Sequence, residues 1–182
     1  MKSCSFFGHR GTPQTEELKQ KMKEVVERLI VEEGVYTFLF GSRSYFDELC
    51  HIVVTELKEK YPQIRRIAYL CKHESVCLVG AGTRLRGQIK EITGRDTYVP
   101  EYEEIKKSDR VNSAGRASYV ERNQWMINES DLAIFCISEE EKSVKSGTLL
   151  AYKFSIKCQK NSIEEVLISS SHRELIIKII RF

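Results

Sequence analysis

Short apolar runs alternate with longer amphipathic stretches in the first 71 residues. The apolar runs occupy positions 4–7, 35–40 and 67–71, and apolar residues recur at helical spacing between them. Strands that alternate with helices are typical of a parallel sheet with crossover helices. The pattern therefore predicts an α/β fold, in which a mainly parallel sheet is flanked by helices on both faces.

The first amphipathic stretch should form a helix that begins near Thr12 and Pro13. Proline fits a first helical turn, where its missing N–H is not needed, and Glu16 and Glu17 suit the positive end of the helix dipole. Gly34 is placed to end the helix, because glycine readily adopts the left-handed conformation found there.

The second amphipathic stretch should form a helix that begins after Ser44. This serine is a candidate N-cap with Asp47 three residues later, and Tyr61-Pro62 would close the helix. Both helices thus start directly after a strand. In open parallel sheets, ligands bind at the carboxyl ends of the strands, where helix N-termini present free N–H groups.

The second half of the chain regains a regular alternation after a less regular middle segment. Residues from about 72 to 113 are expected to form an insertion or lid, with a short helix over 85–92. The pattern then predicts helices over about 117–129 and 147–158, and strands over 131–137 and near 166–169. The apolar tail, 171–182, suits a last strand, a docking helix or an oligomer contact.

Composition is that of an ordinary globular protein. The 182 residues, 41% of them hydrophobic and only 3 of them proline, suit one domain over residues 1–182. The net charge of +3 is too small to indicate a nucleic-acid partner, which is therefore not expected.

Several classes of site and location are disfavoured by spacing. The longest apolar run, 132–137, is too short to cross a bilayer, and no signal pattern opens the chain, so we expect a cytoplasmic protein with no membrane partner. The six cysteines include no C-x-x-C pair and are expected to be reduced thiols in the core. The four histidines are dispersed, so neither a metal site nor a cofactor is expected.

Two strand-to-helix junctions carry glycine and arginine. Gly8-His9-Arg10 ends the first apolar run, and Gly41-Ser42-Arg43 ends the second. Glycine allows a ligand to approach the backbone closely, and arginine can bind a phosphate in a bidentate fork. Asp47 would accept a ribose hydroxyl or cap the second helix. Neighbouring parallel strands would bring the two junctions together at one edge of the sheet.

These segments, taken in order, resemble the SLOG superfamily of Rossmann-like proteins, which includes the LOG phosphoribohydrolases and DprA-type DNA-binding proteins. The resemblance spans roughly residues 3 to 168 and rests on the following segments: Phe6-Phe7-Gly8-His9-Arg10, Gly41 with Phe46-Asp47, Glu121 to Ile127 leading into Ser130-Asp131, and Ser146-Gly147-Thr148. It implies a single Rossmann-like domain with a nucleotide-type ligand across the carboxyl ends of the strands. Arg122 and Asn123 would face that ligand, and Gly147 and Thr148 would bind phosphate at a helix start.

The chain departs from the LOG pattern at the catalytic position. Active LOG enzymes carry Gly-Gly-x-Gly-Thr-x-x-Glu, whose glutamate acts at the N-glycosidic bond, whereas here the run ends in Ser146-Gly147-Thr148-Leu149-Leu150-Ala151. Alanine replaces the glutamate, and the two early glycines are absent. Glu139 is a weak substitute, since it lies in a run of three acids that is typical of a solvated loop.

A competing pattern lies in the middle segment. Residues 76–79 followed by Gly80-Ala81-Gly82 imitate a dinucleotide fingerprint, but Leu85 stands where the third glycine belongs. Either this stretch is a lid whose Arg84 and Arg86 reach the ligand, or it is a connecting loop.

The functional expectation is a sensor or binder of a nucleotide-derived molecule such as AMP, ADP-ribose, NAD or a cyclic nucleotide. A LOG-like hydrolase of nucleoside monophosphates and a DprA-like binder of single-stranded DNA are the alternatives, with enzyme activity disfavoured by Ala151. Arg10, Ser42, Arg122 and Thr148 are the first candidates for ligand contacts. Tyr98, Tyr102 and Tyr119 are candidate platforms for a base, whereas Trp125 is expected in the core. The resemblance also implies a homo-oligomer.

Overall fold

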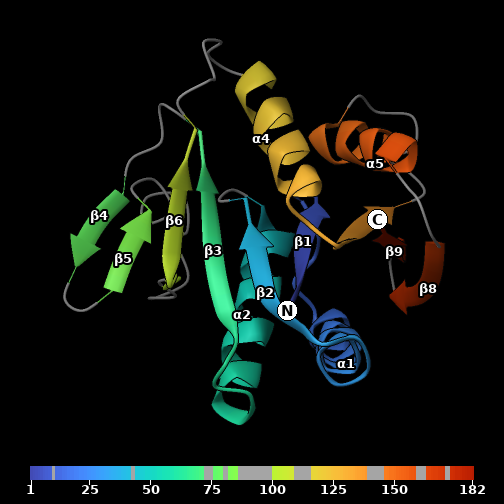
Figure 1. The fold of residues 1–182 in the computed structure, drawn as a ribbon. Coiled ribbons are helices and arrows are strands. Elements are labelled where there is room, and N and C mark those ends of the chain that lie inside the picture. The colour runs from blue at the N-terminus through green and yellow to red at the C-terminus, as the bar shows by residue number, and fades with distance from the viewer. Residues whose placement is uncertain are drawn as a thin grey trace.

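One sheet of seven strands organises the chain, with helices on both faces (Figure 1). The computed structural model describes residues 1–9, 11–41, 44–71, 76–79, 82–85, 100–108, 116–138, 146–158, 163–170 and 173–182. The strands of the main sheet are β1 Lys2–Gly8, β2 Val35–Phe40, β3 Arg65–Leu70, β6 Glu104–Lys107, β7 Leu132–Ser138, β8 Ile163–Ser170 and β9 Arg173–Arg181. The helices are α1 Glu16–Glu33, α2 Tyr45–Lys60, α4 Arg116–Asn128 and α5 Gly147–Cys158.

The strand order is β6-β3-β2-β1-β7-β9-β8. The first five strands of that order are parallel, and β9 runs antiparallel to both of its neighbours, β7 and β8. From β1 the chain passes through α1 to β2 on one side, and from β7 it passes through α5 to β8 on the other. The predicted fold class, a mainly parallel Rossmann-like α/β domain, is therefore confirmed.

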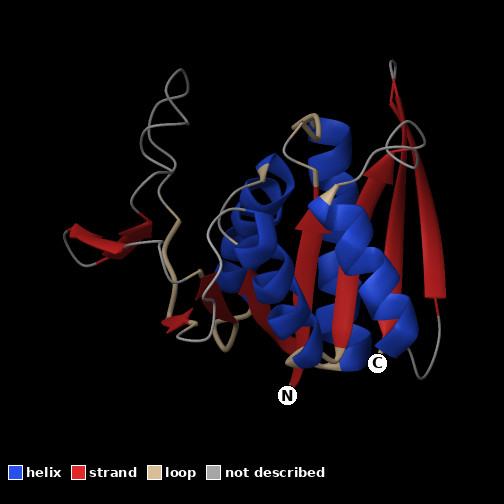
Figure 2. Ribbon diagram, turned by 90° about the horizontal axis from the view of Figure 1, so that it is seen from above, coloured by secondary structure: helices blue, strands red, loops and turns tan. Residues whose placement is uncertain are grey.

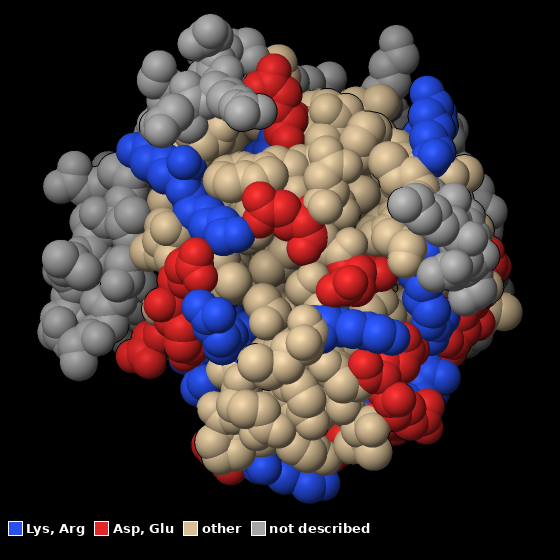
Figure 3. Space-filling view, in the orientation of Figure 1, with Lys and Arg blue, Asp and Glu red and all other residues tan. Residues whose placement is uncertain are grey.

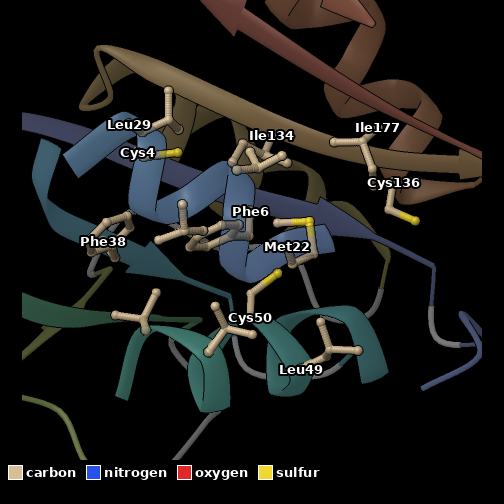
Figure 4. Close-up of a cluster of buried hydrophobic side chains, with 14 of the residues drawn as sticks. Cys4, Phe6, Met22, Leu29, Phe38, Leu49, Cys50, Ile134, Cys136 and Ile177 are labelled. Atoms are coloured by element: carbon tan, nitrogen blue, oxygen red, sulfur yellow. The ribbon is translucent and has the colours of Figure 1, made fainter. Parts of the chain in front are cut away.

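Helices lie on both faces of the sheet (Figure 2), and an apolar layer of side chains lies between the helices and the sheet on each face. Because successive side chains of a strand point to opposite faces, Phe6 packs in the layer under α1 and α2, and Phe7 packs in the layer under α4 and α5. The first layer contains Phe38, Met22 and Leu29, which lie around Phe6 in Figure 4.

The sequence predicted three of the four ends of α1 and α2 correctly. Gly34 ends α1 in the left-handed conformation with φ 70°, and Ser44 caps α2, which ends at Lys60. The start of α1 was predicted wrongly. Thr15 caps it, with its side chain accepting the Leu18 N–H at 3.2 Å, so the first helical residue is Glu16.

Thr12 and Pro13 instead belong to the loop between β1 and α1. The Thr12 hydroxyl donates to the His9 carbonyl at 2.9 Å, and this bond closes a turn in the loop before the helix begins. A threonine followed by proline suits this turn as well as a cap, so the local sequence favoured the wrong site.

The apolar tail is the strand β9, which lies inside the sheet between β7 and β8. Ile177, Ile179 and Ile180 are fully buried there. Arg181 at its end donates to Glu33 at 2.6 Å and to Glu164 at 3.1 Å, which ties the strand to α1 and β8. The tail's hydrophobicity thus belongs to the core, and of the three alternatives for the tail, a last strand is the one that the structure shows.

The glycine-rich middle stretch contains a hairpin in place of a dinucleotide fingerprint. Strands β4, Val76–Val79, and β5, Gly82–Leu85, pair antiparallel with each other as a separate two-stranded sheet. A fingerprint requires a strand followed by a helix, and Gly82 and Leu85 are instead in a strand. The helix expected over 85–92 is therefore wrong at Leu85, and its other residues lie outside the described ones, as does Arg86.

Cysteine placement agrees with the expectation of core thiols. Cys4, Cys50, Cys71 and Cys136 are buried thiols, and Cys158 is a half-buried thiol. Within the described ranges, no cluster of His, Cys, Asp and Glu could hold a metal ion. Among the described helices, none combines the length and the apolar character needed to cross a membrane.

Replacing Ile177 by alanine should lower the free energy of unfolding by about 2–5 kcal/mol, because it leaves a cavity in the middle of the sheet. Denaturant titration measures this loss. The matched control is Val31→Ala, on the 66% exposed Val31 of α1, which should change stability by less than about 0.5 kcal/mol. Equal effects of the two substitutions would contradict a buried tail strand.

Candidate functional site

The carboxyl ends of β1, β2 and β7 meet at one edge of the sheet. Gly8 pairs with Cys136, and β7 continues to Ser138, so His9 leaves the sheet beside the end of β7. At this point the chain from β1 turns to one side of the sheet and the chain from β7 to the other. Such a switch in direction is where open α/β sheets bind their ligands.

Gly8 is required by helix packing. A Cβ atom at this position would lie 2.3 Å from the Cβ of Phe46, which is fully buried in the first turn of α2. From the sequence we expected Gly8 to let a ligand approach the backbone closely. The structure shows that it permits close approach of α2 to the end of β1.

His9 organises the first loop. Its Nδ1 accepts the Gly11 N–H at 3.1 Å, and its carbonyl accepts the Thr12 N–H at 3.2 Å. Since Nδ1 is an acceptor, the neutral ring carries its proton on Nε2. These hydrogen bonds hold Gly11 and Thr12 close to His9 at the carboxyl edge. Arg10, which follows His9, lies outside the described residues.

Asp47 closes the second loop, between β2 and α2. Its carboxylate accepts the Gly41 N–H at 3.4 Å and the Ser44 hydroxyl at 3.0 Å, while the Asp47 N–H donates to the Ser44 Oγ at 3.0 Å. The carboxylate also accepts a backbone hydrogen bond from Ser44, which makes the pattern a capping box that engages both carboxylate oxygens. Of the two interpretations of Asp47, capping is the one that the contacts favour. Ser42 and Arg43 lie outside the described residues.

Arg122 brings α4 to the same edge. The side chain is buried, and a Cβ atom at position 41 would lie 3.0 Å from its Nη2, so glycine at that position makes room for the guanidinium. Nη2 donates to the Asn123 side chain at 3.4 Å, and the ring of Tyr119 lies 5.2 Å from the guanidinium carbon. The structure thus places the Arg122 guanidinium against Gly41, with Asn123 beside it.

The charges at this edge influence each other. Burial raises the pKa of Asp47 to about 6, although the positive charge of Arg122 and the hydrogen bonds from Ser44 and Gly41 act in the opposite direction. At neutral pH the carboxylate is therefore mostly ionised and faces a cation across the end of β2. A carboxylate whose pKa is shifted by burial and by a nearby charge is common at functional sites.

The third predicted element is the start of α5. Ser146 caps this helix, with its Oγ accepting the Leu149 N–H at 3.0 Å. Ser146 and Thr148 are buried, whereas Gly147 is exposed and has open space around its Cβ position. The helix start follows the carboxyl end of β7 and presents its positive dipole end at the same edge of the sheet.

Ala151, which the resemblance sets in the place of the LOG glutamate, faces the core. Ala151 is buried in the layer under α4 and α5, together with Phe7 and Phe135. Glu139, the weak catalytic candidate, lies outside the described residues.

Aromatic candidates divide by location. Tyr119 stands at the site over Arg122, whereas Tyr102 packs edge-on against buried His51 at 4.7 Å between ring centroids. Trp125 packs edge-on against Tyr69 and contacts the second core layer, as the sequence predicted. Tyr98 lies outside the described residues.

The sequence interpretation missed the link between the two loops. The Gln14 side chain in the first loop donates to the carbonyl of Tyr45 at 3.0 Å, and Tyr45 begins α2 with half of its surface exposed. An exposed aromatic residue beside a helix cap is a weak signal, and it could have added Tyr45 to the candidate platforms.

Two other buried basic groups stabilise the fold away from this site. His51 Nε2 lies 2.9 Å from the Glu101 carbonyl, and burial lowers the pKa of His51 to about 3, so the ring stays neutral. Arg66 binds both oxygens of Glu103, with its Nη2 at 2.6 Å, and thereby holds the segment before β6 against β3.

Neither a scan against protein-family models nor a search of the curated proteins finds a match to this chain.

Gly8→Ala should destabilise the protein by about 1–3 kcal/mol, because the added methyl group meets Phe46 at the most crowded point of the edge. The matched control is Gly147→Ala, which adds the same methyl group into open space and should leave the melting temperature almost unchanged. Thermal unfolding of both variants tests this. Equal stability of the two would show that Gly8 has no packing role.

Asp47→Asn should change how stability depends on pH. The folded pKa of Asp47, about 6, lies above its usual value, so the native state binds more protons than the unfolded state between about pH 4 and pH 6. As the pH rises through this window, the stability of the wild type should therefore fall relative to that of Asp47→Asn, by up to about 3 kcal/mol, since one pKa unit corresponds to about 1.4 kcal/mol. Denaturant titrations at a series of pH values measure the difference, and a difference that stays constant with pH would contradict the burial of this carboxylate.

Proposed function

We propose that this chain binds a nucleotide or nucleotide-derived small molecule at the carboxyl edge of its sheet. The observation that carries the proposal is the position of Arg122, whose guanidinium lies against Gly41 at the end of β2, beside the point where β1 and β7 diverge. A buried cation at the edge where α/β sheets bind ligands favours an anionic ligand.

The start of α5 supplies a second source of positive potential. Free N–H groups and the helix dipole favour phosphate there, and exposed Gly147 leaves the backbone open to approach. Tyr119 and Tyr45 provide aromatic surface near Arg122 and the two loops, which suits a base attached to the phosphate. A nucleotide combines these two chemistries in one molecule.

Binding without hydrolysis is supported by Ala151. A catalytic carboxylate at this position of α5 is missing, and the alanine side chain lies in the core under the helix. Basic and acidic side chains are interspersed on the face shown in Figure 3, which supports a small ligand over a DNA strand. Buried cysteine thiols favour a reducing compartment, so we propose that this binding takes place in the cytoplasm.

A thermal-shift screen should identify the ligand class among AMP, ATP, NAD, ADP-ribose, cyclic ADP-ribose and cyclic dinucleotides, since a ligand that binds only the folded state raises the melting temperature. For the compound that stabilises the wild type, Arg122→Ala should weaken binding about 10- to 100-fold in calorimetry, as expected for the loss of a charge-assisted hydrogen bond.

The matched control is Arg65→Ala, because Arg65 begins β3 at the opposite, amino edge of the sheet. This variant should bind as the wild type does. Failure of every compound to shift the melting temperature, or equal binding by Arg122→Ala and the wild type, would overturn the proposal. Release of free base from AMP would replace it with the hydrolase alternative.

A further inference from the structure

Strand β8 forms the outer edge of the sheet beyond β9. It pairs with β9 over all eight of its residues, Ile163–Ser170, and among the described residues no strand pairs with its other side (Figure 1). An edge of this length presents a row of backbone N–H and C=O groups that can pair with another strand.

The charged side chains of β8 do not protect this edge. Glu164 accepts from Arg28 at 2.5 Å and from Arg181 at 3.1 Å, and Glu165 pairs with Lys178 at 2.5 Å. All of these partners belong to the same chain. The strand contains no lysine and no proline, which natural proteins use to block edge pairing.

Apolar side chains on the α5 face of β8 reach solvent. Leu167 is 71% exposed and Ile163 is 39% exposed. They share a face with Glu165, because alternate residues of a strand point the same way. Leu167 is the most exposed large apolar side chain of the described residues after the terminal Met1.

We propose that β8 pairs with β8 of a second copy of this chain, antiparallel about a two-fold axis, so that two sheets join into one. In a continuous sheet, directly opposed residues lie on the same face, which requires that their residue numbers be both odd or both even. Pairing that sets Leu167 opposite Leu167 of the second copy satisfies this rule and removes the exposed leucines from water.

This register also suits the charges. Glu164 and Glu165 then lie opposite positions 170 and 169 of the other copy, which both hold serine. Shifts that centre the axis on residue 164 or 165 would set glutamate against glutamate, which is unfavourable for directly opposed residues. The register centred on Leu167 therefore pairs apolar residues with apolar residues and glutamate with serine, and this self-complementarity favours a second copy as the occupant.

Sedimentation velocity at increasing protein concentration should show the wild type as a dimer. Leu167→Lys should raise the dimer dissociation constant about a hundredfold or more, because it removes apolar burial from both copies and sets like charges opposite each other. The matched control is Val31→Lys, at a 66% exposed position of α1, which should leave the dimer intact. Both variants change an exposed residue and should keep the wild-type melting temperature of the monomer.

The register has its own test. A cysteine placed at position 167 would oppose its copy within disulfide range, so oxidised Leu167→Cys should run as a covalent dimer, whereas oxidised Val31→Cys should not. A wild type that remains monomeric at all concentrations, a dimer that Leu167→Lys leaves intact, or equal cross-linking of the two cysteine variants would overturn the proposal. None of these outcomes depends on the ligand of the carboxyl edge.

Discussion

At the end of β1, the backbone of Gly8 and the side chain of Phe46 are so close that no side chain fits between them. This contact locks the first turn of α2 against β1, although α2 follows β2 in the chain. Asp47 is the next residue, and its orientation toward Gly41 follows from the position of Phe46. The geometry of the whole carboxyl edge depends on this one place where a helix and a strand meet without a side chain between them.

Charge at that edge is balanced at some energetic cost. A carboxylate that loses water on burial becomes harder to ionise. Because the pKa of Asp47 is still raised, the positive charge of Arg122 and the hydrogen bonds from Ser44 and Gly41 offset this burial only in part. Arg66 and Glu103, by contrast, form a bidentate ion pair beside β6 and hold a loop to the sheet. The two buried arginines therefore contribute differently. Arg66 stabilises the fold at the margin of the sheet, whereas Arg122 places a positive charge at the carboxyl ends of the strands.

The predictability of the fold depended on how local each signal was. The sequence predicted the strands at 4–7 and 35–40 and the end of α1 at Gly34. In each case the signal, an apolar run or a capping residue, lies within a few residues of the element that it predicts. The start of α1 was predicted wrongly at Thr12 because threonine before proline favours a turn as well as a helix start. The hairpin at β4 and β5 was missed because glycines after an apolar run are equally compatible with a phosphate loop and with a strand pair.

The sequence by itself determined the alternation of strands and helices, the caps at Ser44 and Gly34, and the position of both glycine loops at strand ends, since these follow from side-chain period and local backbone preferences. Only the tertiary structure decided that the tail is an interior strand, that Gly8 accommodates Phe46, and that Arg122 reaches Gly41. The physical reason is distance along the chain. Contacts between residues 41 and 122, or between 132 and 181, depend on how whole layers pack, and no local pattern of residues specifies them.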